Sequence, residues 1–205
     1  MNKRNSGFTL VEVVVVLAVV AILAAILTPN IVKNIKDSKI ARAANETQVI
    51  AAALASFYKD VGSWPTSDGS SLSDSIRLLY GDGNAPDSSG TNAQYWRSNA
   101  GWSSAYKDTF VNHLIENDPA DGAVNYPDET TVPMPELKWS GPYIIKVKAD
   151  PWGNHYSCNI RYTFYSTQNG VGVLSAGPDR VFNTQVDQAM STFTVGNDDL
   201  ITRIK

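Results

Sequence analysis

The apolar run at residues 8–28 constrains this chain more than any other feature of its sequence. It is interrupted by Thr9 and by the carboxylate of Glu12. About 20 apolar residues in a helix cross the roughly 30 Å core of a bilayer, and a helix pairs its own backbone groups there. Because Lys3 and Arg4 mark the short flank as cytoplasmic, we expect a single-pass protein of the cytoplasmic membrane with its bulk on the other side.

Two simpler interpretations explain less of this run. A secretory signal would place a small-residue cleavage site after an apolar core of about 7–15 residues. Here the small residue Gly7 precedes the run and Pro29 follows it. A plain membrane anchor accounts for the apolar residues but leaves Glu12 unexplained, because a carboxylate within a span is costly and usually has a partner.

The start of the chain resembles a known protein family. The segment Ser6-Gly7-Phe8-Thr9-Leu10-Val11-Glu12 is similar to the class III signal of type IV pilins and type II secretion pseudopilins. The resemblance implies that prepilin peptidase cleaves between Gly7 and Phe8 on the cytoplasmic side and that Phe8 is then N-methylated. It also makes Glu12 the fifth residue of the mature chain, the acidic position of the family, and Pro29 the twenty-second, its usual kink.

The resemblance gives Glu12 a physical role in assembly. Cleavage would create a positive amine at Phe8, and in a filament Glu12 can neutralise that amine on a neighbouring subunit or on its own. Either pairing relieves the cost of a buried charge. We therefore expect Glu12 and Pro29 to serve assembly, and we expect cleavage to proceed without the Glu12 carboxylate.

The rest of the sequence has room for one modest domain, since the chain has 205 residues. Its net charge is −3, and removal of Lys3 and Arg4 takes it to −5, which does not favour a nucleic-acid-binding protein. Cys158 is the single cysteine, so an internal disulfide is excluded. Many major type IV pilins close their C-terminal loop with a disulfide, and this chain must hold that region differently.

A helical pattern continues after Pro29 and ends near Gly62 and Pro65. We expect one helix over residues 8–60. Residues 8–29 would form the membrane or filament core, and residues 30–61 the spine of a globular domain. An apolar stripe marks this spine at Ala43, Thr47, Ile50, Leu54, Phe57 and Val61.

Residues 62–140 are dense in Gly, Ser, Asp, Asn and Pro, which indicates a loop-rich insertion. Two short helices are expected within it, at residues 72–80 and 103–117. Its aromatic residues, among them Trp64, Trp96 and Trp102, argue against disorder. The insertion either presents a surface to partners or is an ordered segment without such a role.

Residues 141–205 are predicted to form an antiparallel sheet and a C-terminal loop. The expected strands are residues 143–148, the alternating run at 155–164, and residues 171–175. Packed on the long helix, they would give an α+β, pilin-like fold. Gly141-Pro142-Tyr143 and Asp150-Pro151-Trp152-Gly153-Asn154 also resemble the pseudopilin sheet, which moves the resemblance toward the major pseudopilin of type II secretion.

The C-terminal loop resembles the calcium site of major pseudopilins, where a Ser-x-Gly-x-Asp segment is followed by an acidic residue before Ile. Calcium takes six to eight oxygen ligands, about 2.3–2.6 Å away. Residues 180–196 are longer than the family's loop, and Arg180 adds a positive charge, so aspartates that only form turns are the alternative. The implied ligands are Asp179 and Asp198, with Asp199 competing for the second place, and the carbonyl oxygens of Leu174 and Ser175.

The residues do not point to catalysis. His113 and His155 are the only histidines, and each is expected to be a surface or packing residue. Cys158 alternates with core positions of a predicted strand, as a buried thiol does. We therefore expect that the chain is not an enzyme.

These features favour a structural subunit that polymerises into the periplasmic pseudopilus of a type II secretion system. From the resemblance, its partners are further copies and other pilin-like subunits, prepilin peptidase, an inner-membrane platform protein and an assembly ATPase. The alternative is a pilin of a type IV or competence pilus, which serves adhesion, motility or DNA uptake. An anchored binding protein outside any filament is a third interpretation.

Overall fold

The computed structural model describes residues 7–70, 75–87, 89, 92, 96, 106–130, 137–164, 166 and 168–205. The chain divides into two compact units, Met1–Lys39 and Ile40–Lys205. The boundary between them falls within helix α1, Leu10–Val61. The helix predicted over residues 8–60 is confirmed.

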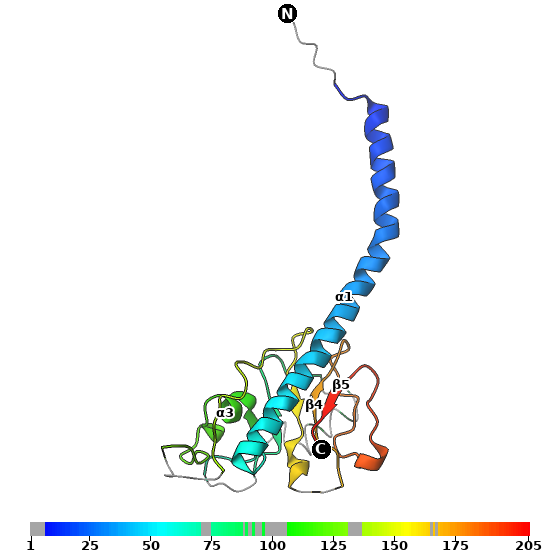
Figure 1. The fold of residues 1–205 in the computed structure, drawn as a ribbon. Coiled ribbons are helices and arrows are strands. Elements are labelled where there is room, and N and C mark those ends of the chain that lie inside the picture. Colours follow the sequence, from blue (N-terminus) through cyan, green and yellow to red (C-terminus); the bar gives the residue numbers. More distant parts are fainter. Residues whose placement is uncertain are drawn as a thin grey trace, which may run out of the picture. The chain divides into compact units, whose positions relative to one another are not determined.

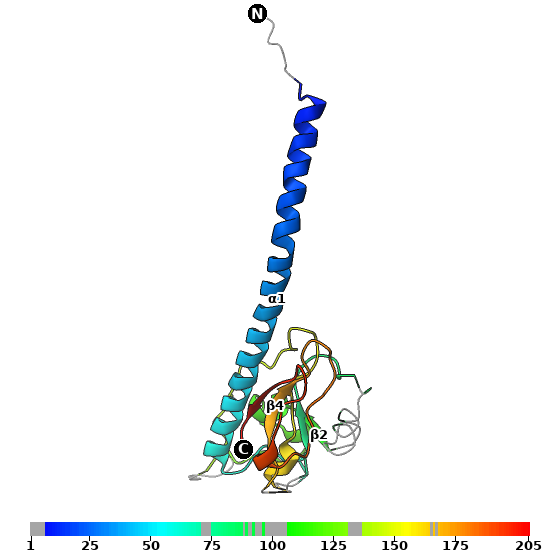
Figure 2. The same cartoon turned by 90° about the vertical axis from the view of Figure 1, so that its right-hand side faces the viewer.

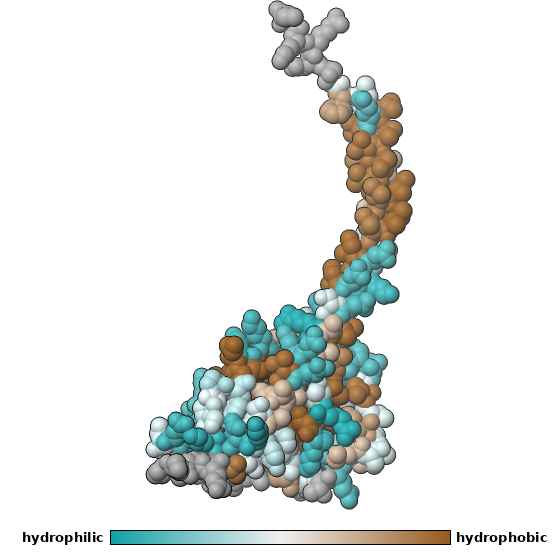
Figure 3. Space-filling view, viewed as in Figure 1, coloured by the Kyte–Doolittle hydropathy of each residue, from teal (hydrophilic) through white to brown (hydrophobic). Residues whose placement is uncertain are grey.

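The described part of the first unit is dominated by the start of α1. Every residue from 7 to 39 is exposed to solvent. Apolar side chains cover most of the visible face in the first part of this segment, apart from a hydrophilic patch near its start, and hydrophilic residues gather farther along it (Figure 3). Among the described residues, α1 is the helix that is long and apolar enough to cross a membrane, judged by length and composition. Such a continuous apolar surface requires lipid or protein to cover it.

In the second unit, α1 lies along one face of a small sheet (Figures 1 and 2). The Phe57 ring meets the Tyr126 ring edge-on, with 4.9 Å between centroids. The helix ends where Gly62, at φ +78°, donates its N–H to the Tyr58 carbonyl oxygen, a positive φ that glycine adopts at little cost. The predicted stripe supplies the core residues Ala43, Thr47, Ile50, Leu54 and Phe57, each at most 2% exposed.

The sheet of the second unit is mixed, with the strand order β2-β1-β3-β4-β5. Strands β1 (Leu78–Tyr80) and β2 (Lys107–Thr109) pair in parallel. The other neighbours pair antiparallel: β3 (Ser157–Cys158), β4 (Gly172–Ser175) and β5 (Leu200–Arg203). The α+β fold is confirmed, but the sheet is not purely antiparallel, because the insertion contributes β1 and β2.

The remaining described elements are short. They are α3 (Phe110–Leu114) and three 3₁₀ turns, η1 (Pro119–Asp121), η2 (Ile160–Thr163) and η3 (Met190–Thr192). The ammonium of Lys205 donates to the carbonyl oxygens of Tyr162, at 2.9 Å, and Thr163, at 3.3 Å. This contact holds the residues after β5 against the end of η2.

The helix predicted at residues 72–80 is wrong in its described part. Residues 78–80 form β1, and residues 72–74 lie outside the described residues. Ile76, Leu78 and Leu79 are each at most 1% exposed, so consecutive positions are buried on both faces. Periodicity cannot separate such a fully buried strand from a short buried helix.

The helix predicted at residues 103–117 is much shorter than expected. Residues 103–105 lie outside the described residues, residues 107–109 form β2, and α3 begins at Phe110. Thr109 caps α3, because its Oγ1 accepts the Asn112 N–H at 3.2 Å. The predicted i, i+4 pair of Phe110 and Leu114 is buried, as a core face requires.

The strand predicted at residues 143–148 is absent from the structure. Its backbone contacts are isolated: Tyr143 N–H donates to the Leu114 carbonyl oxygen, and the Val147 carbonyl oxygen accepts from Asp82 N–H. No described strand lies beside the segment to form a ladder. Ile145 is 95% exposed as a result.

The alternating run at residues 155–164 forms a strand only at β3. Asn159 ends it, because its amide donates to the carbonyl oxygens of Gly170 and Val186 and its Oδ1 accepts Gly172 N–H. The chain then turns into η2. The predicted strand at residues 171–175 is confirmed as β4.

Candidate functional site

The residues around the predicted cleavage site lie at the start of α1. Phe8 is 89% exposed and precedes the helix. Thr9 N–H and Oγ1 both donate to Glu12 Oε2 at 2.8 Å, and Thr9 Oγ1 accepts Glu12 N–H at 3.3 Å. This reciprocal arrangement is a capping box, in which each residue satisfies a free donor of the first turn. The Thr-x-x-Glu spacing in the sequence is a signal for this capping box, which was not among the expectations from sequence.

Pro29 lies inside α1, as expected. A proline lacks the N–H that would pair with the carbonyl oxygen four residues earlier, and it therefore weakens the helix locally. The neighbouring Thr28 donates its hydroxyl to the Ala24 carbonyl oxygen at 2.6 Å. Both features bend helices, which makes this turn a point of local adjustment.

The sheet brings the two halves of the predicted calcium loop together. Ser175, the last residue of β4, pairs with Leu200, the first residue of β5. The residues that follow β4 therefore meet those that precede β5 at the same end of the sheet. Consistent with this, a Cβ on Gly177 would lie 2.2 Å from the Asp198 carbonyl oxygen, so only glycine fits there.

Asp179 and Asp198 are direct neighbours in this loop. Asp198 Oδ2 accepts the Asp179 N–H at 3.0 Å. The exposed Asp179 carboxylate accepts from Val181 N–H and from the Asn183 side-chain amide, both at 2.8 Å. Burial raises the pKa of Asp198, and the nearby negative charge of Asp179 adds to the increase.

Asp199 is more deeply buried, at 4% exposed. Its Oδ2 accepts the backbone N–H groups of Asn183, at 2.9 Å, and Thr184. Burial raises the pKa of Asp199 to about 6, although these hydrogen bonds act in the opposite direction. Asp199 was expected only as a competing ligand, and its role in holding residues 183–184 has no separate signal in the sequence.

The predicted carbonyl ligands differ in their surroundings. Leu174 pairs with Ser157 on one side and Ile201 on the other, within the sheet. Ser175 lies at the sheet's end beside the loop, and its hydroxyl donates to Asp150 Oδ2 at 2.7 Å. Ser175 is therefore the better placed of the two for a loop site.

Some carboxylate oxygens of this loop are suitable ligands for a hard cation, but the side chains alone do not form a complete site. Asp198 Oδ1 and Asp199 Oδ1 are buried and have no hydrogen-bond partner among the described residues. Buried carboxylate oxygens without a partner are costly, and calcium prefers such ligands. However, the described residues include no group of three or more His, Cys, Asp or Glu side chains placed to hold a metal ion. Main-chain oxygens would have to complete the site.

His113 lies in a buried polar network that the sequence did not signal. Its Nε2 is 2.9 Å from Asp108 Oδ2, and its Nδ1 is 2.9 Å from the Tyr126 hydroxyl. His113 itself is fully buried. Of the two predicted alternatives, it is therefore a packing residue and not a surface residue.

His155 and Cys158 also belong to the packed domain. His155 is partly buried and its Nδ1 contacts the Gly81 carbonyl oxygen, and burial lowers the pKa of its imidazole. Cys158 is a free, fully buried thiol in β3, as predicted. Burial raises its pKa, which keeps the thiol protonated and unreactive.

Two family models match separate parts of the chain. The prokaryotic N-terminal methylation motif matches residues 2–28, which include Gly7, Phe8 and Glu12. The model of type II secretion system protein G matches residues 123–192. The second match contains β3, β4 and Asp179 but ends before Asp198.

Relatives from both groups resemble the chain. A type II secretion system core protein G from Aeromonas hydrophila is 25% identical over 155 residues, 76% of this chain and 73% of that protein. The type IV major pilin protein PilA of Myxococcus xanthus is 41% identical over 59 residues, 29% of this chain and 27% of the pilin. PilE of Neisseria gonorrhoeae, also a type IV major pilin, is 34% identical over 83 residues, 39% of this chain and 50% of the pilin. The chain therefore spans most of the Aeromonas protein but half or less of the two pilins.

No solved structure matches the chain. The methylation motif, the protein G match and the α+β fold point in one direction. The chain is related to the type IV pilins and the type II secretion pseudopilins, and its domain carries the protein G signature of the second group.

Proposed function

We propose that the chain is a structural subunit that polymerises into the pseudopilus of a type II secretion system and so drives the export of folded proteins. The observation that carries this proposal is the protein G match at residues 123–192 in a chain that also has the methylation motif. The Aeromonas core protein G matches 76% of this chain, whereas the two pilins match 29% and 39% of it. The role is structural, not enzymatic.

The subunit would mature and assemble as the sequence implies. Prepilin peptidase would remove residues 1–7 and methylate Phe8, and the subunit would wait in the inner membrane with its domain in the periplasm. A platform protein and an assembly ATPase would then move it into the fibre. The exposed apolar start of α1 supports this route, because that surface must be covered by lipid or by neighbouring helices.

The alternative is a pilin of a type IV or competence pilus, which the PilA and PilE relatives favour. Deletion of the gene separates the two functions. We score the deletion strain by the proteins in its culture supernatant and by surface fibres under the electron microscope. Loss of secreted proteins with intact pili supports the pseudopilin, and loss of pili with intact secretion supports the alternative.

Glu12 has two possible roles, neutralising the Phe8 amine and capping the helix with Thr9. One pair of variants separates them. Glu12→Gln keeps an acceptor for the capping box but removes the charge, whereas Thr9→Val breaks the box and keeps the charge. If Glu12 neutralises the Phe8 amine, Glu12→Gln lowers fibre yield by roughly tenfold while cleavage proceeds, and Thr9→Val assembles nearly as well as the wild type. Immunoblots measure both cleavage and sheared fibres. If Thr9→Val lowers fibre yield and Glu12→Gln does not, Glu12 serves only to cap the helix.

We also propose a structural calcium ion in the C-terminal loop. Asp179 and Asp198 would provide carboxylate ligands, and Asp199 Oδ1 would be a further ligand atom. Main-chain oxygens near Ser175 would complete the coordination. The two buried oxygens without a partner support this assignment. When bound, the ion would neutralise the carboxylates and tie residues 177–179 to residues 198–199, in place of a disulfide.

A further inference from the structure

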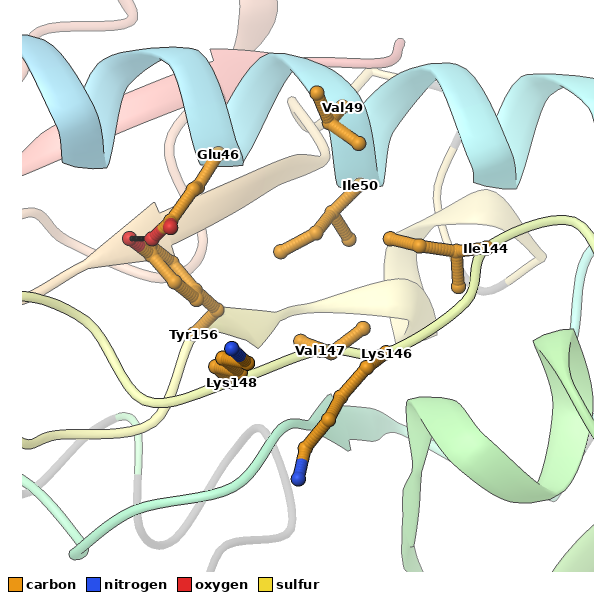
Figure 4. Close-up of a pocket in the computed structure, with 8 residues that line it drawn as sticks. All are labelled: Glu46, Val49, Ile50, Ile144, Lys146, Val147, Lys148 and Tyr156. Carbon is orange, nitrogen blue, oxygen red and sulfur yellow. Dashed lines mark hydrogen bonds between the residues drawn. The ribbon is translucent and has the colours of Figure 1, made fainter.

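A groove runs along the second unit between α1 and residues 144–148 (Figure 4). Its volume is about 260 Å³, below the roughly 300–1,000 Å³ of typical small-molecule pockets. Ile50 and Val147 are each 2% exposed and form its floor. The groove therefore suits a side chain or two of another protein better than a cofactor.

The surroundings of the groove have the composition of an interface. Val49 lines the groove from α1 and is 56% exposed, and the partly buried Ile144 lines it from the opposite segment. An apolar centre with a charged rim is typical of protein–protein contacts. The rim here consists of Lys146 and Lys148, both exposed.

The charge of this rim is basic. Glu46 also lines the groove, but its carboxylate is already engaged by the Tyr156 hydroxyl and by Arg42 Nε, the latter at 2.9 Å. The basic residues that line the groove are Lys146 and Lys148. Lys146 lies 3.5 Å from Asp82, whereas Lys148 has no ion-pair partner among the described residues. The groove therefore fits an acidic partner.

The same chain presents an acidic counterpart. Residues 115–121 contain three acidic residues and no Lys or Arg. Glu116 and Asp121 are exposed, at the end of α3 and in η1. Neither carboxylate forms an ion pair with a residue that the structure describes. We call residues 115–121 the acidic turn.

We propose that the groove of one subunit docks the acidic turn of a second copy of the chain. Lys148 would face Glu116, and the copy would cover Val49 and Ile144. A groove and a turn are different surfaces, so their contact is heterologous and can repeat without closing, as a fibre requires. The inference rests on the proposed function and adds to it a lateral contact between globular domains.

A charge swap in the full-length chain tests this contact. Lys148→Glu and Glu116→Lys should each reduce sheared fibres about fivefold, and the two together in one chain should restore the yield to within about twofold of wild type. Lys59→Glu, at an exposed lysine in the last turn of α1, is the control and should assemble normally. Normal yield from both single reversals would overturn the inference and leave the proposed function intact.

Disulfide trapping provides an independent test, because native Cys158 is fully buried. A chain with both Lys148→Cys and Glu116→Cys should give a ladder of linked multimers on non-reducing gels, whereas each single variant should not. A band that stops at the dimer, or fibres without a ladder, would overturn the heterologous contact. If the wild-type chain forms no fibres at all, the proposed function fails and this inference fails with it.

Discussion

Two buried aspartates organise two loops of this domain in different ways. Asp108 Oδ1 accepts Thr109 N–H, at 2.7 Å, and the Asn112 amide, at 2.8 Å. Its Oδ2 accepts Ala120 N–H at 2.6 Å and lies beside His113. Both of its oxygens are thus satisfied by the protein.

Asp199 is buried to a similar degree but leaves one oxygen unpaired. Its Oδ2 holds residues 183–184, whereas Oδ1 has no partner among the described residues. The Asp108 carboxylate is therefore fully paired by protein groups alone. The loop around Asp199 has acceptors in excess of donors, which is the condition under which a bound cation stabilises a fold.

The largest expected effect comes from removing the fully paired Asp108 carboxylate. Asp108→Ala removes the acceptor for two backbone N–H groups and leaves His113 buried without its partner. We expect a loss of about 3–5 kcal/mol in unfolding free energy, or about 10 °C in Tm, with or without calcium. Thermal unfolding of the full chain in detergent measures it. A loss below about 1 kcal/mol would show that the network is not a stabilising centre.

Calcium should act on the other loop alone. At a free concentration about 100 times Kd, a ligand that binds only the folded chain adds about 2.7 kcal/mol, and we expect the Tm to rise accordingly. Asp198→Asn should abolish this rise. Asp187→Asn, at a nearby aspartate that accepts a hydrogen bond from Gln185, is the matched control and should keep it. If calcium raises the Tm of both variants equally, calcium does not bind at this site.

A smaller effect concerns pH in calcium-free protein. The pKa of Asp199 is about 6 in the folded chain against an ordinary value of 3.8, so the folded state binds its proton more tightly than the unfolded state. Unfolding free energy should therefore fall as pH rises from about 4 to about 6, by on the order of 1–2 kcal/mol, and then level off. Urea unfolding across this range measures the slope, which Asp199→Asn should flatten. A slope of opposite sign would contradict the burial of an ionisable Asp199.

The parts of the fold that were predictable are those fixed by local sequence. The stripe through Ile50, Leu54 and Phe57 and the stop at Gly62 specify α1 without tertiary help. Asp150 likewise specifies its own turn, since its Oδ1 accepts the N–H groups of Trp152 and Asn154 at 2.9 and 2.8 Å.

The secondary structure was predicted wrongly where contacts with distant parts of the chain determine it. Leu78 and Leu79 form a strand because β2 and β3 flank them, and β2 lies about thirty residues away along the chain. Residues 143–148 have a strand-like sequence, but no described strand lies beside them. The β-propensity of a segment describes how well it packs in a sheet, but it does not show whether another strand lies beside it.

The candidate site residues also fall into two groups, those recognisable from local sequence and those that only the fold brings together. The motif residues Gly7, Phe8 and Glu12 could be located from sequence because their pattern is contiguous. Asp179 and Asp198 could be paired only through the resemblance, and the register of β4 with β5 is what brings them together. The contacts of Asp108, His113 and Tyr126 span loops whose approach no local pattern encodes.

The exposure of the first unit has an energetic consequence for how the subunit travels. Keeping the large apolar side chains from Phe8 to Leu27 in water would cost on the order of 20–40 kcal/mol, more than the roughly 5–15 kcal/mol that stabilises a typical domain. A subunit cannot cross an aqueous gap between bilayer and fibre at such a cost. Under the proposed function, transfer from the bilayer into the fibre would therefore have to keep this helix covered by apolar surface at every step.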